Sequence, residues 1–305
     1  MSTTSYSIAV LPGDGIGPEV VAAALSVLHA VAPKIGRRFN TVEHPAGAQH
    51  FLDTGVALPD ATLGACRSAD AILFGAMGLP HVRGRDGTEI IPQLDLRFAL
   101  DLYAGVRPIR TFAGLPGPLS SPHAADIDLV LVRESTEGLF FARGGGHIEG
   151  EGDARAAYDT MKITHAGTAR VCDFALRLAR QRKAQGKPGR VTSVDKANVF
   201  TSMAFWRETF EERAKAWPDV ATDSAYVDAM ALNLVMKPWA YDVLVTENMF
   251  GDILSDLIAA LAGGMGMAPS GADPICCGVW AKKRSASAQI ASAMIAPMSA
   301  AAAGK

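Results

Sequence analysis

Two aspartates, Asp252 and Asp256, stand four residues apart in a segment whose sequence predicts a helix. At this spacing both carboxylates lie on one helix face about 6 Å apart, where oxygen ligands can hold a hard divalent cation. A third carboxylate, Asp228, lies upstream in an apolar stretch. Its burial without a partner would cost several kcal/mol, so a cation or hydrogen-bond donors should accompany it. The three aspartates predict a metal site.

Three arginines, Arg97, Arg107 and Arg133, come well before the two aspartates of the helix. A planar guanidinium binds a carboxylate through two parallel hydrogen bonds, so arginines can hold an acidic substrate beside a metal ion. Each arginine alone would be an ordinary surface residue. In combination with the aspartates, they predict a metal-assisted reaction on a small polycarboxylic acid.

The acidic pair also has a simpler interpretation, because two acidic residues four apart usually mark a solvent-exposed helix face. Apolar residues on both sides, such as Phe250 and Ile253, argue that this face borders a pocket. Lys196 has a simple interpretation as well. Taken alone, it is expected to pair with Asp195 or to face solvent.

Composition is that of an ordinary globular protein, with 305 residues, 49% hydrophobic and 20% charged. The net charge of -2 and the pI near 6.4 supply no positive field, so we expect neither nucleic acid nor a membrane surface as a partner. The four cysteines lack metal-binding spacing, which fits a reducing cytoplasm. We expect no secretion leader, and no segment that approaches a membrane span of roughly 20 apolar residues.

Short apolar segments alternate with amphipathic ones along the chain. This alternation predicts an α/β fold with a mixed, largely parallel sheet. We expect strands at 7–11, 71–75, 128–132, 191–194 and 243–246, an extended segment at 106–108, and helices at 20–32, 92–102 and 166–185, with a further helix carrying the aspartates.

Four polar residues fall at or just after predicted strand ends, namely Arg133, Lys196, Glu247 and Asn248. Ligand sites of such folds gather at the carboxyl ends of strands, so these residues are expected to share a cleft.

Gly13, Gly15 and Gly17 follow the first predicted strand and precede a helix. Glycines in this position can let backbone amides approach a dinucleotide phosphate. The third glycine and the following acidic residue are misplaced for the usual dinucleotide fingerprint, so a tight turn that serves only packing remains the alternative. A simple dinucleotide dehydrogenase built on these glycines would leave the charged residues unexplained.

Five motifs, at residues 11–19, 102–108, 132–138, 194–198 and 248–256, together resemble the isocitrate/isopropylmalate dehydrogenase family. The resemblance covers roughly residues 5 to 269. It implies a two-lobed, three-layer fold, with residues 1–103 plus 263–305 in a first lobe on the cofactor side and 104–262 in a second lobe for dimerisation, metal and substrate.

The resemblance also implies roles for individual residues. The substrate-binding arginines would be Arg97, Arg107 and Arg133, and the metal ligands Asp252 and Asp256 with Asp228 from a partner subunit. Lys196, also from the partner, would take part in proton transfer from the substrate hydroxyl, so a homodimer with shared sites is implied. The oxygen-only ligands suit Mg²⁺ or Mn²⁺, and the cofactor would be NAD or NADP. Gly75, Glu247 and Asn248 are the candidate cofactor contacts.

Two features depart from the family pattern. The family usually has a tyrosine that donates a proton to the enol product, whereas this chain has Phe140, which cannot donate one. From Gly271 to Lys305 the expected adenosine-binding motif is missing. If this is the native end of the chain, an exposed apolar edge and a poor nucleotide site are expected.

Substrate choice in the family depends on the residues before Arg97, here Ile90, Gln93 and Leu94. The apolar majority favours 3-isopropylmalate, while Gln93 could meet a carboxylate or hydroxyl of isocitrate, tartrate or D-malate. Such contacts discriminate by only about 1–3 kcal/mol, so the alternatives stay open. Phe140 and the altered tail also keep open a non-catalytic subunit that has lost cofactor binding.

Overall fold

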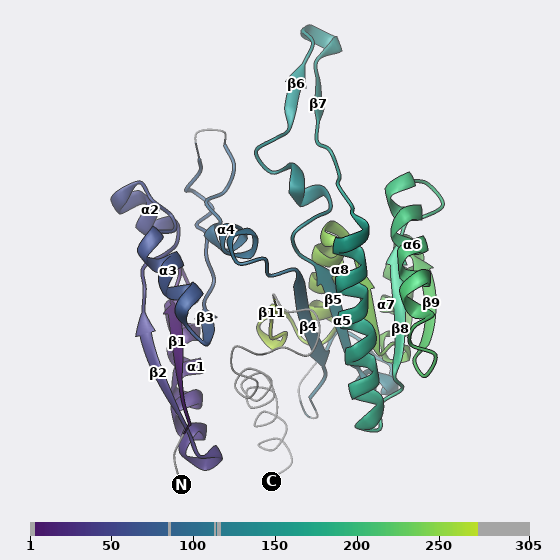
Figure 1. Cartoon of the computed structure of the whole chain (residues 1–305), viewed down its shortest axis with the longest axis horizontal. Helices are drawn as coiled ribbons and strands as arrows, with labels where there is room; N and C mark the ends of the chain where they lie inside the picture. Colours follow the sequence, from purple (N-terminus) through teal and green to yellow (C-terminus); the bar gives the residue numbers. More distant parts are fainter. Residues whose placement is uncertain (1–3, 85–86, 113, 115–116, 274–305) are drawn as a thin grey trace. The chain divides into compact units, whose positions relative to one another are not determined.

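The structure is a computed structural model that describes residues 4–84, 87–112, 114 and 117–273. Within these residues the chain forms two compact units, one ending at Leu100 and one beginning at Asp101 (Figure 1). Residues 274–305, most of the tail in which the expected adenosine-binding motif is missing, lie outside the described residues.

The first unit is built on a parallel sheet of three strands in the order β2-β1-β3. Its core packs Tyr6, Ile8 and Val10 of the central strand against Val21 and Leu28 of the first helix. The elements are β1 (Thr4–Leu11), α1 (Gly17–Val31), η1 (Ala32–Ile35), β2 (Arg37–Glu43), α2 (Ala48–Thr54), α3 (Asp60–Ser68), β3 (Ala71–Phe74) and α4 (Pro92–Ala99).

Helix α1 together with η1, residues Gly17–Ile35, is long and apolar enough to cross a membrane, with a hydropathy of 1.3. This finding corrects the expectation that no segment approaches that length. Length and composition are weak evidence, because helices that pack on a soluble core pass the same test. Here Val21 and Leu28 pack against the sheet, while Val20 and Val27 are exposed.

The second unit contains a six-stranded sheet in the order β11-β4-β5-β10-β8-β9. Strands β5, β10, β8 and β9 are parallel, and β4 and β11 pair antiparallel. The strands are β4 (Ala104–Arg110), β5 (Asp128–Glu134), β8 (Arg190–Asp195), β9 (Ala221–Tyr226), β10 (Val243–Thr246) and β11 (Gly271–Asp273). The predicted mixed, largely parallel α/β fold is thus confirmed.

Helices cover both faces of this sheet, because alternate residues of each buried strand point to opposite sides. Val130 and Val132 of β5 face the core formed with α5 and α6, whereas Leu129 and Leu131 face the core formed with α7 and α8. The helices are α5 (His165–Ala184), α6 (Thr201–Ala214), α7 (Val227–Met236) and α8 (Asn248–Leu261), and the 3₁₀ turns of this unit are η2 (Pro122–Asp126), η3 (Leu139–Ala142), η4 (Gly152–Ala154), η5 (Pro238–Ala240) and η6 (Met265–Met267).

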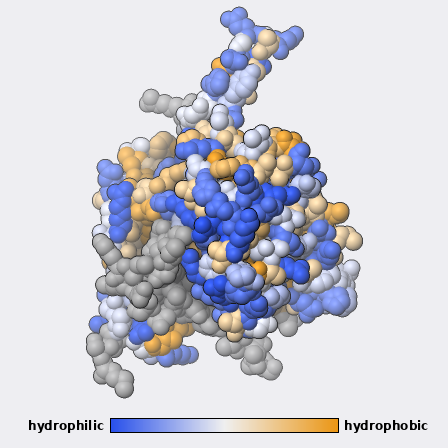
Figure 2. Space-filling model, turned by 45° about the vertical axis from the view of Figure 1, so that its right-hand side comes forward, coloured by the Kyte–Doolittle hydropathy of each residue, from blue (hydrophilic) through white to orange (hydrophobic). Residues whose placement is uncertain are grey.

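A two-stranded antiparallel arm, β6 (His147–Glu149) and β7 (Ala156–Tyr158), projects from the second unit (Figure 1). Its surface carries both hydrophilic and apolar residues (Figure 2). Among the apolar ones, Ile148 and Tyr158 are largely exposed. Because these apolar side chains are exposed to solvent, the arm has no hydrophobic core of its own.

Most predicted elements occur close to their expected bounds. The clearest difference is α4, expected to reach residue 102, which ends at Ala99. Asp101 has a positive φ of 48°, a left-handed conformation that cannot continue a right-handed helix. The expected lobe boundaries stay a prediction. In the described chain β11 pairs with β4, so Gly271–Asp273 belongs to the sheet of the second unit.

Candidate functional site

The polar residues expected at strand ends do share one edge of the second sheet. In the strand register Thr246 of β10 lies opposite Arg133 of β5 on one side and Val194 of β8 on the other. The residues that follow, Glu247 and Lys196, therefore leave the sheet at this same carboxyl edge. Parallel pairing brings them together although they are far apart in sequence.

Arg133 is the centre of this edge, and its side chain is only 2% exposed. Its Nε and Nη2 atoms donate to Oδ1 of Asn248 at 2.9 and 2.6 Å, and its Nη1 donates to Asp252. The Phe140 ring lies beneath the guanidinium, with 4.9 Å between the ring centroid and Cζ. Burial lowers the pKa of Arg133, and the Asp252 carboxylate opposes that shift. Contacts on several sides hold this guanidinium in one orientation.

Arg107 lies on β4, the antiparallel neighbour of β5. Burial and the nearby Arg133 cation both lower its pKa, whereas Asp252 and Asp256 raise it. Its Nη1 also donates to the Ser270 hydroxyl. A buried cation, Arg133, and a partly buried one, Arg107, repel each other and form a region of positive potential, and an anion would relieve the repulsion. The pair Arg107 and Arg133 can thus bind a carboxylate.

Asp252 and Asp256 lie one turn apart on α8, as the sequence predicted. The helix buries Leu254 and Ile258 and leaves both aspartates outward, with the Asp252 side chain 50% exposed. Ser255 donates to the Asp252 carbonyl oxygen at 2.8 Å and contacts Asp256 at 3.4 Å. These exposed carboxylates retain free acceptor positions, and such an all-oxygen donor set suits a hard cation.

Lys196 and Asp228 contact each other, with 2.6 Å between Nζ and Oδ1. This hydrogen bond from Lys196 lowers the pKa of Asp228. One of the two simple interpretations of Lys196, a salt bridge with Asp195, is wrong, because Asp195 is buried and binds Arg207 instead. Within the described residues of this single chain, no three His, Cys, Asp or Glu side chains are close enough to hold a metal ion. Asp228 therefore does not join Asp252 and Asp256 in one chain.

Glu247 and Asn248 are buried and serve the fold at the start of α8. Glu247 caps the helix by accepting from the backbone amides of Met249 and Phe250, and burial raises its pKa. Asn248 receives two hydrogen bonds from Arg133 and donates to the Glu137 carbonyl oxygen at 3.0 Å. Their expected contact with a cofactor stays a prediction.

The other predicted site residues belong to the first unit. Leu94 is buried, while Ile90, Gln93 and Arg97 are partly exposed. Gln93 Nε2 donates to the Met77 carbonyl oxygen at 3.4 Å, whereas its Oε1 is buried and has no hydrogen-bond partner. The roles expected for these four residues in substrate binding stay predictions.

The glycine turn after β1 is a packing feature. A Cβ atom on Gly13 would overlap the Ala76 carbonyl oxygen, and one on Gly75 would overlap the Pro12 carbonyl oxygen. Asp14, only 4% exposed, accepts from the backbone amides of Ala48, Gln49 and Gly78 at 2.7 to 2.9 Å. A buried carboxylate at the start of α2 repels a phosphate, so the geometry favours the packing alternative over dinucleotide binding.

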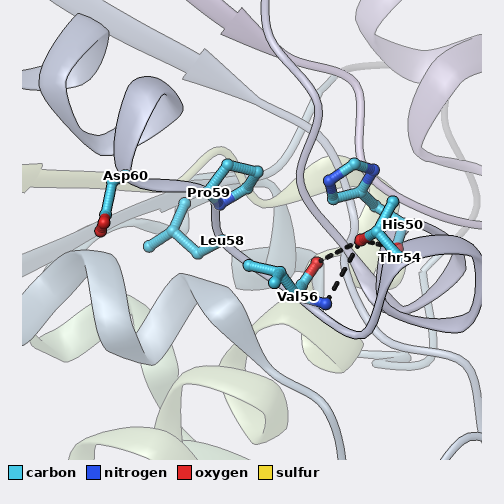
Figure 3. Close-up of a pocket in the computed structure, with 6 residues that line it drawn as sticks. All are labelled: His50, Thr54, Val56, Leu58, Pro59 and Asp60. Atoms are coloured by element: carbon cyan, nitrogen blue, oxygen red, sulfur yellow. Dashed lines mark hydrogen bonds between the residues drawn. The ribbon is translucent and has the colours of Figure 1, made fainter.

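A shallow pocket between α2 and α3 gathers other residues. It is lined by His50, Thr54, Val56, Leu58, Pro59 and Asp60 (Figure 3). The Thr54 hydroxyl is engaged by the backbone of His50 and Val56. None of the predicted site residues lines this pocket.

Comparisons with known proteins show the family of the chain. The sequence model of the isocitrate/isopropylmalate dehydrogenase family matches residues 7–276. A 3-isopropylmalate dehydrogenase from Moorella thermoacetica is 43% identical over 270 residues, which cover 87% of this chain and 74% of the relative. One from Pseudoalteromonas translucida is 43% identical over 278 residues, covering 88% of this chain and 75% of the relative.

Solved structures give the same picture. An isocitrate dehydrogenase from Methylococcus capsulatus matches with a TM-score of 0.75 and 37% identity, covering 87% of this chain and 73% of that one. A β-decarboxylating dehydrogenase from Thermococcus kodakarensis matches with a TM-score of 0.68 and 35% identity, covering 89% and 73%. The chain belongs to the isocitrate/isopropylmalate dehydrogenase family. It is a decarboxylating dehydrogenase of this metal-dependent family, acting on a small hydroxy acid.

Sequence reasoning missed one residue that shapes the site and one contact of a residue that it selected. Asn248, named as a candidate cofactor contact, also holds Arg133. Arg207 was not singled out at all, although it binds Asp195 through two hydrogen bonds. In the sequence it resembles any surface arginine of a helix, so only the fold reveals its partner.

Proposed function

We propose that this protein oxidises and decarboxylates a malate-type 2-hydroxy acid with Mg²⁺ or Mn²⁺ and NAD or NADP, and that the substrate is 3-isopropylmalate. The observation that carries the proposal is the contact between buried Arg133 and half-exposed Asp252, with Arg107 alongside. It combines a carboxylate receptor with an oxygen donor for a cation at one strand edge. The relatives named 3-isopropylmalate dehydrogenase support the choice of substrate.

The chain's own residues divide into three roles. Arg107 and Arg133 bind the substrate carboxylates and orient the hydroxyl-bearing carbon, and Arg97 is the third proposed carboxylate-binding arginine. Asp252 and Asp256, with Asp228 of a second copy, would hold the divalent cation, which when bound supplies Lewis-acid stabilisation of developing negative charge. Lys196 of the second copy accepts the proton of the substrate hydroxyl. Gly75, Glu247 and Asn248 remain the proposed surroundings of the nicotinamide cofactor.

A homodimer follows from the position of Asp228. One chain does not bring it to Asp252 and Asp256, yet its side chain is 68% exposed and already paired with Lys196. Beside it, α7 exposes Leu232 and Met236 by 64% and 65%, and Ile253 of α8 is also exposed. Exposed apolar side chains grouped on one helix mark a protein interface. A second copy seated there would present Lys196 and Asp228 to its partner's aspartates.

The substrate alternatives depend on α4 and the residue before it. Ile90 and Leu94 favour an aliphatic substituent, whereas the buried unpartnered Oε1 of Gln93 could accept a hydrogen bond from a hydroxyl of tartrate or isocitrate. D-malate, which lacks the substituent, is the third alternative. We place the enzyme in the cytoplasm, in keeping with the free buried thiols of Cys66 and Cys172.

Phe140 favours a second proposal within the dehydrogenase family, a subunit that keeps the acid and metal sites but has no turnover of its own. Its ring packs on Arg133 and carries no proton to donate. If the protein is an enzyme that lacks this proton donor, Phe140→Tyr should raise turnover by at least about tenfold. An inactive protein that gains nothing from the tyrosine would favour the non-catalytic subunit.

The decisive experiment follows reduced nicotinamide formation by the purified protein with Mn²⁺, NAD and NADP. Isopropylmalate, isocitrate, D-malate and tartrate are offered in parallel, with EDTA as the control. Turnover that requires the metal would identify the substrate and the cofactor. A folded dimer that turns over none of the four with either cofactor would contradict the proposal.

A further inference from the structure

Arg207 of α6 lies between the two strand ends that carry Lys196 and Asp228. Its Nε and Nη2 atoms donate to the two carboxylate oxygens of Asp195 at 2.9 and 2.8 Å. Its guanidinium also lies over the Tyr226 ring, with 4.8 Å from Cζ to the centroid. Asp195 directly precedes Lys196, and Tyr226 is the residue from which α7 with Asp228 begins. One side chain thus contacts both strand ends.

We propose that Arg207 is a positioning residue that fixes Lys196 and Asp228 relative to each other. The inference rests on the proposed function, in which these two residues act together in the site of a second copy. Neither Lys196 nor Asp228 contacts Arg207 through its own charged group in the hydrogen bonds described, so its action passes through Asp195 and Tyr226.

The surroundings show why Arg207 can transmit position. The Asp195 carboxylate is fully buried and also accepts from the Ala197 amide at 2.9 Å, so it holds the backbone on both sides of Lys196. In the register of β8 and β9, Asp195 lies opposite Tyr226. The adjacent Trp206 anchors α6 to β8 through a 3.0 Å hydrogen bond to Ser193. A planar guanidinium that is held by two hydrogen bonds, on a helix that is itself anchored to the sheet, has little freedom to move.

Lysine cannot replace this geometry. It keeps the charge but offers a single ammonium group, which cannot form the parallel pair of hydrogen bonds or stack as a plane on Tyr226. The Arg207→Lys variant is therefore expected to let residues 195–197 and the start of α7 move independently. The hydrogen bond from Lys196 Nζ to Asp228, which is 2.6 Å long in the structure, would then be formed for a smaller fraction of the time.

The same helix offers a matched control. Arg213 also forms a double hydrogen bond with an aspartate, Asp173 of α5, at 3.1 and 2.8 Å. Asp173 is not at the strand edge that carries the site. Arg213→Lys thus removes the same kind of double hydrogen bond from the same helix. It measures how far such a loss lowers stability without any change at the site.

The experiment compares both lysine variants in the full-length protein. For Arg207→Lys we expect kcat to fall by about tenfold and the Mn²⁺ half-saturation concentration to rise, with KM for the hydroxy acid within about twofold because Arg107 and Arg133 lie on other strands. Arg213→Lys should keep kcat within about twofold. Asp195→Asn combined with Arg207→Lys should be no worse than either change alone, because both remove one interaction.

A second readout does not need turnover. The rate at which an acylating reagent labels Lys196, followed by mass spectrometry, should rise several-fold in Arg207→Lys and stay at the wild-type value in Arg213→Lys. Equal labelling in the two variants would overturn the inference, as would equal kcat. Absence of turnover by the wild-type protein would instead contradict the proposed function, and the labelling rates would still decide the role of Arg207.

Discussion

The glycine turn after β1 and the start of α8 both place a carboxylate near a helix N-terminus. The two carboxylates differ in whether their hydrogen-bond acceptor positions are occupied or free. Asp14 is buried and accepts three backbone hydrogen bonds, so its acceptor positions are occupied within the first unit. Asp252 is half exposed and contacts only one described side chain by hydrogen bond, that of Arg133.

The difference shows how a structural carboxylate and a site carboxylate can be told apart. A carboxylate whose acceptor positions are all filled by donors of the protein stabilises the fold. A carboxylate with exposed acceptor positions beside a buried cation can bind a ligand. In the sequence, the structural and the site carboxylate both occur in glycine-containing segments. Their surroundings in the fold separate them.

The largest expected effect is on turnover by Asp252→Asn. The amide lacks the negative charge that attracts a divalent cation, and such cations supply several kcal/mol in the transition state, so Mn²⁺-dependent turnover should fall by at least about a hundredfold. The free energy of unfolding should fall as well, by about 1–3 kcal/mol, because the buried Arg133 loses the negative charge of its partner. Asp60→Asn, in the pocket of Figure 3, is the control and should leave turnover intact.

Alanine at Gly13 and Gly15 tests the other region. Both glycines have positive φ, 77° and 56°, so alanine at either should cost about 1–2 kcal/mol. At Gly13 the added methyl also meets the Ala76 carbonyl oxygen, whereas the space at Gly15 is open, so Gly13→Ala should cost roughly 2 kcal/mol more. Urea unfolding measures the difference. A specific rise in KM for the nicotinamide cofactor in both variants would instead revive the phosphate-binding interpretation.

Asp14→Asn addresses the carboxylate of the same turn. The amide offers one oxygen in place of two, so at least one charge-assisted hydrogen bond is lost, and the free energy of unfolding should fall by about 2–3 kcal/mol. Below the midpoint of thermal unfolding, kcat should stay near the wild-type value. Loss of turnover in a variant of unchanged stability would mean that Asp14 acts in the site after all.

The smallest effect is expected at the opposite end of the second sheet, where Asp128 bonds Lys187 and Arg182. Burial raises its pKa, but these two cations more than offset that, so its folded-state pKa lies below the ordinary value. The ion pair therefore stabilises the fold above the unfolded-state pKa, near 3.9, and the contribution is lost as pH falls through the lower folded-state value. Asp128→Asn should be destabilised at pH near 7 and match the wild-type protein in strong acid. An equal deficit at both pH values would contradict the ion-pair explanation.

Much of the fold could be predicted because its secondary structure is encoded by local sequence patterns. Apolar runs such as 128–132 and 243–246 predict buried strands, and the register of those strands places Arg133 beside Thr246. The end of α4 could not be predicted, since Asp101 combines a left-handed backbone with two hydrogen bonds from Arg170, which is distant in sequence. The β6–β7 arm also lacked a sequence signal, because its strands of three residues are too short to show periodicity.

The candidate site was predicted in its charged residues but not in their pairing. Arg107, Arg133, Asp252 and Asp256 were selected for residue type and spacing, and they lie near one another in the second unit. The pairing of Lys196 with Asp228 instead of Asp195 joins residues separated by 32 positions in the sequence. The roles of Arg97, Ile90, Gln93 and Leu94 in the first unit stay predictions.

By itself the sequence determined the fold class, the family and the residue types that could bind a cation and an acid. These depend on composition, period and motif order, which are properties of neighbouring residues. The tertiary structure decided which carboxylates have their hydrogen-bonding positions filled and which keep some free. Asp14 is bound by the distant amides of Ala48, Gln49 and Gly78, and Asp195 by Arg207, whereas Asp252 stays half exposed beside Arg133. Burial and hydrogen bonding between distant segments set the free energy of each charge, and only the folded chain defines those distances.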